Sequence, residues 1–394
     1  MIGSNAHPRA LLAMAEGTAV PRPATPAVRA SSAAMRPVLI PISGRDVTCG
    51  VSDYVRTLAA SIEAVRPGLV EVAHVEPGRP LAFMRLILAR LRAGGTVHLN
   101  LPVEGWGTSL LPGASLFLAR LLTRRGRAVL TLHEWLSLHP LRHLSLLPNL
   151  WVADVAILVS RQQWRGFRVA RSVRRGLAAR ARMIPIGPNI MHAGEAPTPA
   201  PRPADGRLRI GYFGVLYASK QPGLMLESLA ALARRGRDAC LVVCGDFLAD
   251  KPEERDAFLA QARALGVEDR LEMRGRIEDP RDVLDLLASC DLHLLLYSDG
   301  VSTRRSSFLA CLQLPQPIVT TQPVEPDEFE GWPAVEGAIE AGEIICLPAD
   351  ATPEAVAEAI EKAADEAGLR KPADLAELWS KAAVGHLALY GERA

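Results

Sequence analysis

The sequence predicts an α/β protein made of two doubly wound domains, each with a parallel sheet covered by helices. Short apolar runs alternate with helical patterns along most of the 394 residues, which is typical of such folds. The alternation stops in a proline-rich stretch, residues 193–206, and then starts again. The two parts also differ in charge, because residues 37–192 carry +12 and residues 207–394 carry −12. A division into two domains with different partners explains both the restart of the pattern and the difference in charge.

The positive charge of residues 37–192 comes from arginine, with 20 Arg, no Lys and 8 acidic residues. Such a surface suits an anionic membrane or an acidic acceptor, although solvated faces of ordinary helices would account for the arginines equally well. Residues 161–182 are the most basic, with eight Arg, and we expect them to be helical. They lack a clean apolar stripe, so membrane contact there would be electrostatic.

Five segments follow from composition and patterning. Residues 1–36 are rich in Ala, Pro and Ser, so we expect a disordered extension, with Met35 just before the first strand-like run. The other segments are a first Rossmann-like domain over 37–192, a linker over 193–206, a second Rossmann-like domain over 207–372 and a C-terminal helical segment over 373–394.

The sequence also predicts a cytoplasmic protein. It has no run of 18 apolar residues, and the apolar patch around Leu11 is too short for a secretory signal. The 6 cysteines lack paired CxxC spacing, so we expect reduced thiols and neither disulfides nor a zinc site.

In the first domain, strands are expected to alternate with helices. The strands are predicted at 38–43, 69–75, 96–100, 128–132 and 154–160, and the helices at 51–62, 81–92, 112–123 and 161–182. Gly44, Cys49 and Gly50 lie in the loop between the first strand and the first helix. This pattern indicates a candidate phosphate or acceptor loop, and a plain connecting turn would share it.

In the second domain, the same alternation continues. The strands are predicted at 208–213, 239–244, 271–273, 291–297, 317–321 and 344–347, and the helices at 223–235, 253–265, 280–289, 353–367 and 373–389. Residues 323–339 show no clear period.

The turn after the strand 291–297 has an unusual sequence. Asp299 and Gly300 lead into residues 302–305, Ser-Thr-Arg-Arg, which we expect to form the first turn of a helix. Free backbone N–H groups, the helix dipole and two guanidinium groups would then form an anion site. Because neighbouring helical residues point about 100° apart, Arg304 and Arg305 are expected to reach different partners.

These motifs resemble those of retaining GT-B glycosyltransferases, most closely family 4. The resemblance is specific in the second half and looser in the first. In the second half it is carried by Ile210–Lys220, Val242–Gly245, Arg274–Ile277, Ala288–Leu296 and Asp299–Thr321. In the first half it is carried by the 44–50 loop and by His133-Glu134 at a strand end, and residues 377–379 and 386–390 resemble the family's C-terminal helix, which usually crosses back to the N-domain.

The resemblance implies a GT-B fold, in which an acceptor-side N-terminal domain and a nucleotide-sugar-binding C-terminal domain face a central cleft. Lys220 matches the lysine that contacts the donor diphosphate, and His133 matches the histidine near the transferred sugar. A fixed cation suits a departing diphosphate, because that group gains negative charge. A solvated loop lysine and a histidine that only packs are the alternatives.

Further donor-binding residues follow from the same resemblance. Gly214 and Gly245 lie in loops that approach the donor, and Arg276 follows a glycine where the family's backbone meets the nucleobase. Val215 stands where many members carry another cation, which Arg304 or Arg305 would replace.

The sequence departs from family 4 at its two glutamates, which are separated by seven residues. Ser302 and Ala310 occupy these positions, and Asp299 is the acid that could take the first role. A bacterial subgroup that resembles family 4 has Gly-Val-Ser-x-Arg-Arg, which residues 300–305 match. The donor-binding set is therefore predicted to include Ser302, Arg304, Arg305 and Ser306, and a surface helix start is the alternative for the arginine pair.

The predicted function is transfer of a hexosyl-type sugar from a nucleotide diphosphate sugar to a glycan or lipid-linked acceptor, with retention of configuration. Catalysis is assigned to His133, Lys220 and Asp299. No Asp-x-Asp occurs, so metal independence and no cofactor are expected, with contact to an anionic membrane at its inner face and none to nucleic acid. The alternatives are a degenerate GT-B module that binds sugar without turnover and a membrane scaffold acting through residues 161–182.

Overall fold

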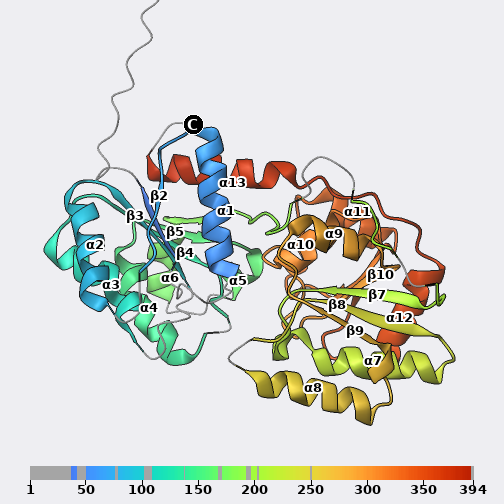
Figure 1. Ribbon diagram of the computed structural model, residues 1–394. Coiled ribbons are helices and arrows are strands. Elements are labelled where there is room, and N and C mark those ends of the chain that lie inside the picture. The colour runs from blue at the N-terminus through green and yellow to red at the C-terminus, as the bar shows by residue number, and fades with distance from the viewer. Residues whose placement is uncertain are drawn as a thin grey trace, which may run out of the picture.

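The computed structural model describes residues 37–41, 50–75, 79–101, 109–136, 138–166, 171–191, 197–201, 204–248 and 251–391. The expected extension over 1–36 and the loop residues Gly44 and Cys49 lie outside these ranges. Two α/β halves stand side by side, each around its own sheet (Figure 1). The predicted fold class is confirmed, and the limits proposed for the domains and the linker stay predictions.

The first sheet has six parallel strands in the order β2-β1-β3-β4-β5-β6. Their side chains alternate between two cores, because successive strand residues point to opposite faces. The strands are β1 (Val38–Pro41), β2 (Glu71–Val72), β3 (Thr96–Leu101), β4 (Arg127–Leu132), β5 (Val155–Leu158) and β6 (Ala181–Met183).

One face of this sheet is covered by α2, α3 and α4, and the other by α1 and the C-terminal helix α13 (Figure 1). Many of the helices begin with proline in the first turn. A backbone N–H has no partner within the helix at that position, so proline, which lacks this group, is tolerated there. In this half the helices are α1 (Gly50–Val65), α2 (Pro80–Arg92), α3 (Leu111–Leu122), α4 (Pro140–Val152), α5 (Arg161–Arg165) and α6 (Arg171–Ala178).

The single helix predicted over residues 161–182 is wrong. The structure has α5, which ends at Gly166, then α6, and then the edge strand β6. The prediction also missed α4, which contains Pro148 within its last turns. A proline inside a helical pattern usually indicates the end of a helix. In the structure, α4 continues through Pro148 while packing against α3.

The second sheet has six parallel strands in the order β12-β11-β10-β7-β8-β9. The chain starts in the middle with β7, runs outward to β9, and then returns to the other side of β7. The strands are β7 (Leu208–Phe213), β8 (Ala239–Cys244), β9 (Leu271–Gly275), β10 (Leu292–Leu295), β11 (Ile318–Thr321) and β12 (Ile344–Leu347).

The helices of the second half lie on both faces of this sheet (Figure 1). Residues 323–339, which had no clear period, include the short helix α11. These helices are α7 (Pro222–Arg234), α8 (Pro252–Ala264), α9 (Pro280–Ala288), α10 (Ser306–Leu312), α11 (Pro333–Glu340) and α12 (Pro353–Asp365), and the chain ends with α13 (Ala376–Tyr390).

The last helix, α13, returns to the first half and lies across α1 (Figure 1). Its His386 Nε2 is 3.0 Å from the Tyr54 hydroxyl, and its Tyr390 hydroxyl is 2.7 Å from Nδ1 of His98. Trp379 Nε1 donates to the carbonyl of Pro188 at 2.9 Å. Buried polar contacts therefore join the end of the chain to the first sheet.

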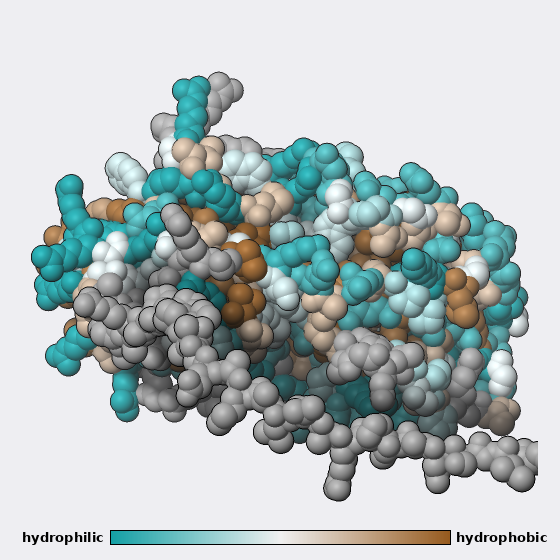
Figure 2. Space-filling view, turned by 90° about the horizontal axis from the view of Figure 1, so that it is seen from above, coloured by the Kyte–Doolittle hydropathy of each residue, from teal (hydrophilic) through white to brown (hydrophobic). Residues whose placement is uncertain are grey.

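On the face seen in Figure 2, hydrophilic residues predominate and hydrophobic residues form small separate patches. Within the described ranges, no helix has both the length and the apolar character needed to cross a membrane.

Candidate functional site

The candidate site lies where loops leave the carboxyl ends of strands in both sheets. In the second sheet, β7 and β10 are neighbours from which the chain runs in opposite directions, and such a switch point is where doubly wound sheets bind ligands. Lys220 follows β7 and Asp299 follows β10. The two loops are joined directly, because the backbone N–H of Ser298 donates to the carbonyl of Ser219 at 2.9 Å.

Three glycines at the ends of β7, β8 and β9 form a backbone floor beside this switch point. All three have positive φ: 127° at Gly214, 144° at Gly245 and 65° at Gly275. A Cβ on Gly245 would lie 2.0 Å from the carbonyl oxygen of Gly214, so no other residue fits there. The N–H of Gly245 donates to the carbonyl of Gly275 at 2.9 Å. These strand ends therefore present backbone and no side chains at the three glycines.

Lys220 is buried at the end of a short 3-10 turn (Ala218–Lys220). Its Nζ lies 4.2 Å from the ring centroid of Tyr297, a cation–π contact, and no carboxylate of the described residues pairs with it. Burial lowers the pKa of Lys220 well below its usual value, and the charges of Arg305 and Arg304 lower it further. A buried ammonium without a counterion is ready for an anionic ligand.

The turn that follows β10 is held together by one carboxylate. Asp299 Oδ2 pairs with Arg304 Nη2 at 2.7 Å, and Asp299 Oδ1 pairs with Nη2 of Arg305. The guanidinium of Arg305 also lies 4.7 Å from the ring centroid of Tyr297. Both arginines are almost completely buried, with 6% and 5% of their side chains exposed.

Two predictions about this turn are wrong. Residues 302–305 are not helical, because α10 begins only at Ser306, so the turn offers no helix dipole of the expected kind. Arg304 and Arg305 also do not point to different partners, since both bind Asp299. Gly300, with φ of 75°, bends the chain tightly enough to bring the two guanidinium groups together.

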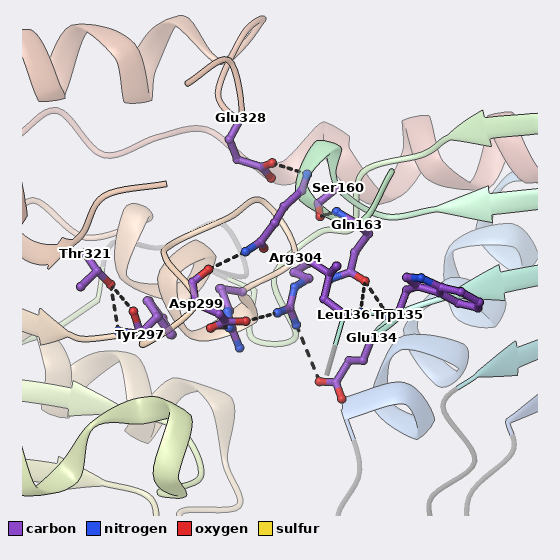
Figure 3. A network of polar contacts seen from close by, with 12 residues as sticks. Glu134, Trp135, Leu136, Ser160, Gln163, Tyr297, Asp299, Arg304, Thr321 and Glu328 are labelled. Atoms are coloured by element: carbon purple, nitrogen blue, oxygen red, sulfur yellow. Dashed lines mark hydrogen bonds and ion pairs between the residues drawn. The ribbon is translucent and has the colours of Figure 1, made fainter. Parts of the chain in front are cut away.

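His133 and Glu134 enter from the first half, directly after β4. Glu134 Oε1 lies 3.7 Å from Arg304 Nη1, so this carboxylate reaches across to the arginine (Figure 3). The ring of His133 packs edge-on against Tyr54 at 4.5 Å, and its buried Nε2 has no hydrogen-bonding partner. Burial lowers the pKa of His133 to about 3, aided by the nearby charges of His386 and Arg304. The imidazole is therefore neutral at physiological pH.

Short helix α5 connects the two groups of site residues. Its Gln163 side chain accepts hydrogen bonds from the backbone N–H groups of Trp135 and Leu136, just after Glu134 (Figure 3). Gln162 donates through Nε2 to the carbonyl of Asp299. Two consecutive glutamines therefore fix the loop after β4 against the turn after β10.

Glu328 completes this connection, and sequence reasoning missed it. It is only 2% exposed and lies above the turn (Figure 3). Its Oε1 accepts from the backbone N–H and the hydroxyl of Thr303, at 2.9 and 2.8 Å. Its Oε2 accepts from the backbone N–H of Gln162 at 2.9 Å. One buried carboxylate thus binds both halves of the molecule.

Ion pairs surround the contact that Gln162 and Glu328 make between the two halves. Arg161 pairs with Asp327 at 2.7 Å and with Glu330, and Arg165 pairs with Glu325 at 3.1 Å and with Asp327 at 2.6 Å. Part of the basic segment expected to meet a membrane is therefore occupied by the acidic loop that carries Glu328.

Several buried polar atoms around the turn lack partners. Ser302 Oγ, Arg304 Nε and Arg305 Nε are unpaired, as is His133 Nε2. Buried polar groups normally have a hydrogen-bonding partner, so these atoms are candidates for contact with a ligand that supplies oxygen acceptors.

The remaining predicted residues lie farther out. Ser306 is half-buried at the first position of α10, and Arg276 is exposed, one residue beyond β9 at the edge of the sheet. Gly50 is exposed at the start of α1, and the rest of its loop lies outside the described residues. The assignment of these residues to donor or acceptor binding stays a prediction.

Because several histidines are buried, we expect the folded state to lose stability in acid. Burial lowers the pKa of His293 and His386 to about 4 and that of His133 to about 3, whereas an unfolded histidine titrates near 6.5. As pH falls from 6.5 to about 4, the unfolded chain takes up protons that the folded chain does not, so the free energy of unfolding decreases. We expect each histidine to contribute about 1.4 kcal/mol per pH unit.

Calorimetry between pH 7 and 5 measures this decrease. His293→Gln should reduce its slope, whereas His74→Gln, at an exposed position, should leave it unchanged. Equal slopes in the parent and the His293 variant would contradict the prediction.

Comparison with known proteins finds similarity in part of the sequence and in the fold. Residues 198–302, which contain β7 to β10 and their loops, match the model of the family Glycosyl transferases group 1. No curated protein matches the chain significantly.

Solved structures resemble the chain at low sequence identity. The Anabaena protein HepE, in complex with UDP and glucose, is 15% identical with a TM-score of 0.56, over 91% of this chain and 95% of that chain. Sucrose-phosphate synthase from Thermosynechococcus elongatus is 15% identical with a TM-score of 0.60, over 90% and 95%. The lipopolysaccharide outer core galactosyltransferase WaaB is 12% identical with a TM-score of 0.53, over 91% and 99%.

These similarities confirm the predicted fold class. The structures share the two-sheet GT-B architecture, and the family match covers residues 198–302, which include Lys220 and Asp299. The chain therefore has the GT-B fold, and its residues 198–302 are similar to Glycosyl transferases group 1.

Proposed function

We propose that the protein moves a hexosyl-type sugar from a nucleotide diphosphate sugar to an acceptor with retention of configuration. One observation carries the proposal: Lys220, Arg304 and Arg305 gather, buried, at the switch point of the second sheet. Among the described residues, Asp299 and Glu134 are the carboxylates that face these three basic groups, so a net positive charge remains when Lys220 is protonated. A diphosphate is the group that would neutralise it.

The chemistry follows from this charge. As the bond between the anomeric carbon and the donor phosphate breaks, the departing diphosphate gains negative charge, which Lys220 and the arginines stabilise in a buried setting. Asp299 holds the two guanidinium groups in position and offers oxygens to sugar hydroxyls. His133, being neutral, serves as a hydrogen-bonding partner of the sugar.

Retention needs no protein nucleophile in this proposal. The acceptor hydroxyl attacks from the face that the diphosphate leaves, and a phosphate oxygen takes its proton. The protein contributes position and neutralisation. Because three cations supply the neutralisation, we expect no metal requirement and no cofactor.

The donor and acceptor classes are proposed from the relatives. HepE has been solved with UDP-glucose, and WaaB is a galactosyltransferase of the lipopolysaccharide outer core. UDP-hexoses are therefore the first donors to test, with a glycan or lipid-linked acceptor at the inner face of the cytoplasmic membrane. Residues 300–305 would place the chain in the bacterial subgroup with Gly-Val-Ser-x-Arg-Arg.

A catalytically degenerate module is the second candidate. Ser302 and Ala310 stand in place of two family glutamates, and the carboxylate of Asp299 is already engaged by arginines. Such a protein would bind nucleotide sugar without turning it over.

A donor panel separates the two candidates. We expect one UDP-hexose to raise the melting temperature and to release UDP when lipid extract or polysaccharide is added, with equal rates in EDTA and in Mg²⁺. A melting shift without UDP release from any acceptor preparation would favour the binding module. No shift with any nucleotide sugar would contradict both.

A further inference from the structure

The outer face of the first half exposes a cluster of large apolar side chains. On α4, Leu141, Leu144 and Trp151 recur at the spacing that places them on one side of the helix, and Trp151 is 77% exposed. On α3, Leu118, Leu121 and Leu122 do the same. We name this set the apolar ridge: Leu118, Leu121, Leu122, Leu141, Leu144 and Trp151.

The two helices that form the ridge are neighbours with the same direction. The backbone N–H of Leu116 donates to Asn149 Oδ1 at 2.9 Å, and Asn149 Nδ2 donates to the carbonyl of Pro112 at 2.8 Å. A Cβ on Gly113 would lie 2.7 Å from the carbonyl oxygen of Ser145, so the helices approach closely. Their inner faces pack on the first sheet, which leaves both apolar stripes on the outside, next to α2 (Figure 1).

The charged side chains that the structure describes on the helices around the ridge are basic. Helices α2, α3 and α4 contain no Asp or Glu. Arg85, Arg92, Arg124 and Arg125 are exposed beside them, and none is paired with a carboxylate of the described residues. The acids of the adjacent strand ends are neutralised, since Glu71 pairs with Arg90 and Asp154 with Arg120.

We propose that this face docks on an anionic lipid bilayer. The apolar ridge enters the interface between headgroups and acyl chains, where leucine and tryptophan are favoured, and the four arginines contact lipid phosphates. A second copy of the chain on the same face would bring like charges together, so a symmetric dimer is disfavoured.

This proposal moves the membrane contact from the place predicted for it. The basic segment around α5 is tied to Glu325, Asp327 and Glu330, whereas α3 and α4 offer exposed apolar residues as well as unpaired charge. The contact is thus both inserted and electrostatic. It does not depend on sugar transfer, because vesicle binding is measured without any donor.

Cosedimentation with vesicles of phosphatidylcholine, with and without phosphatidylglycerol, tests the proposal. We expect binding to the anionic vesicles, at least about tenfold weaker in the variant L121S/L144S/W151S because three apolar side chains are lost from the interface. The variant R85Q/R125Q should lose the preference for phosphatidylglycerol and the salt dependence. Leu369→Ser, at a residue 75% exposed in the other half, is the matched control and should bind as the parent does.

Fluorescence adds a local readout. Trp151 should shift to shorter wavelength on binding, and the shift should be lost in Trp151→Phe. Equal vesicle binding by the parent and the triple variant, or no binding by the parent, would overturn the proposal. So would a concentration-dependent dimer that the triple variant abolishes. Circular dichroism of each variant checks that the exposed substitutions leave the fold intact.

Discussion

Replacing Lys220 by methionine should lower kcat/KM for the donor by about 10²–10³-fold, the usual effect of removing one group that stabilises transition-state charge. Stability should not decrease, because the ammonium of Lys220 is buried, lacks a counterion and has a pKa well below its usual value. Methionine has a similar length and no desolvation cost. We therefore expect a large loss of activity with an equal or higher melting temperature, measured by steady-state kinetics and calorimetry.

The control for this variant is Lys251→Met. The side chain of Lys251 is 45% exposed and pairs with Glu254 in the first turn of α8, so its kinetic effect should be small. Donor affinity gives a second readout, because K220M should bind the nucleotide sugar more weakly than the parent in isothermal titration calorimetry. Unchanged turnover in K220M would remove Lys220 from the site.

Replacing Glu328 by glutamine should lower the free energy of unfolding by about 2–3 kcal/mol, because charge-assisted hydrogen bonds are lost and a donor replaces an acceptor. The carboxylate accepts from Thr303 through one oxygen and from Gln162 through the other. In glutamine one of these oxygens becomes an NH₂ group, which cannot accept, so the hydrogen bonds on that side are lost. Since Thr303 precedes Arg304, we also expect kcat at saturating donor to fall by about tenfold or more, from misplacement of the arginines.

Glu330→Gln is the matched control for Glu328. Its side chain is 65% exposed and its ion pair with Arg161 lies at the rim, so the change in unfolding free energy should stay within about 0.5 kcal/mol. Chemical denaturation and kinetics well below the melting temperature separate stability from positioning. If E328Q lost stability but kept its kcat, Glu328 would hold the interface without aligning the turn.

Much of the fold could be predicted because the inner strands of the second sheet are buried and read as apolar runs. Residues 239–244 and 344–347 are continuous apolar runs, residues 208–213 are interrupted by Arg209, and the structure has strands with these limits. Residues 161–182 were misread because their charge masks the break at Gly166, and α11 because eight residues are too few to show a period.

The site could be predicted only where it follows strand ends. Lys220 and Asp299 occupy loops after β7 and β10, which the alternating pattern locates. Glu328 gave no such signal, because it accepts from a backbone N–H 166 residues away and its neighbours have no period. The convergence of Arg304 and Arg305 on Asp299 was also hidden, since it depends on the turn at Gly300 and not on helical geometry.

The return of α13 to the first half has a consequence for biosynthesis. Nδ1 of His98 and the hydroxyl of Tyr54, in the first half, find partners in Tyr390 and His386 of α13, whereas Nε2 of His98 already has Thr131. During synthesis, the first half therefore emerges from the ribosome long before the Tyr54 hydroxyl and Nδ1 of His98 can reach their partners in α13. Until the last helix emerges, that half would remain a substrate for chaperones. A nonsense codon near residue 375 would therefore destabilise the first half, at the start of the chain, more than the second.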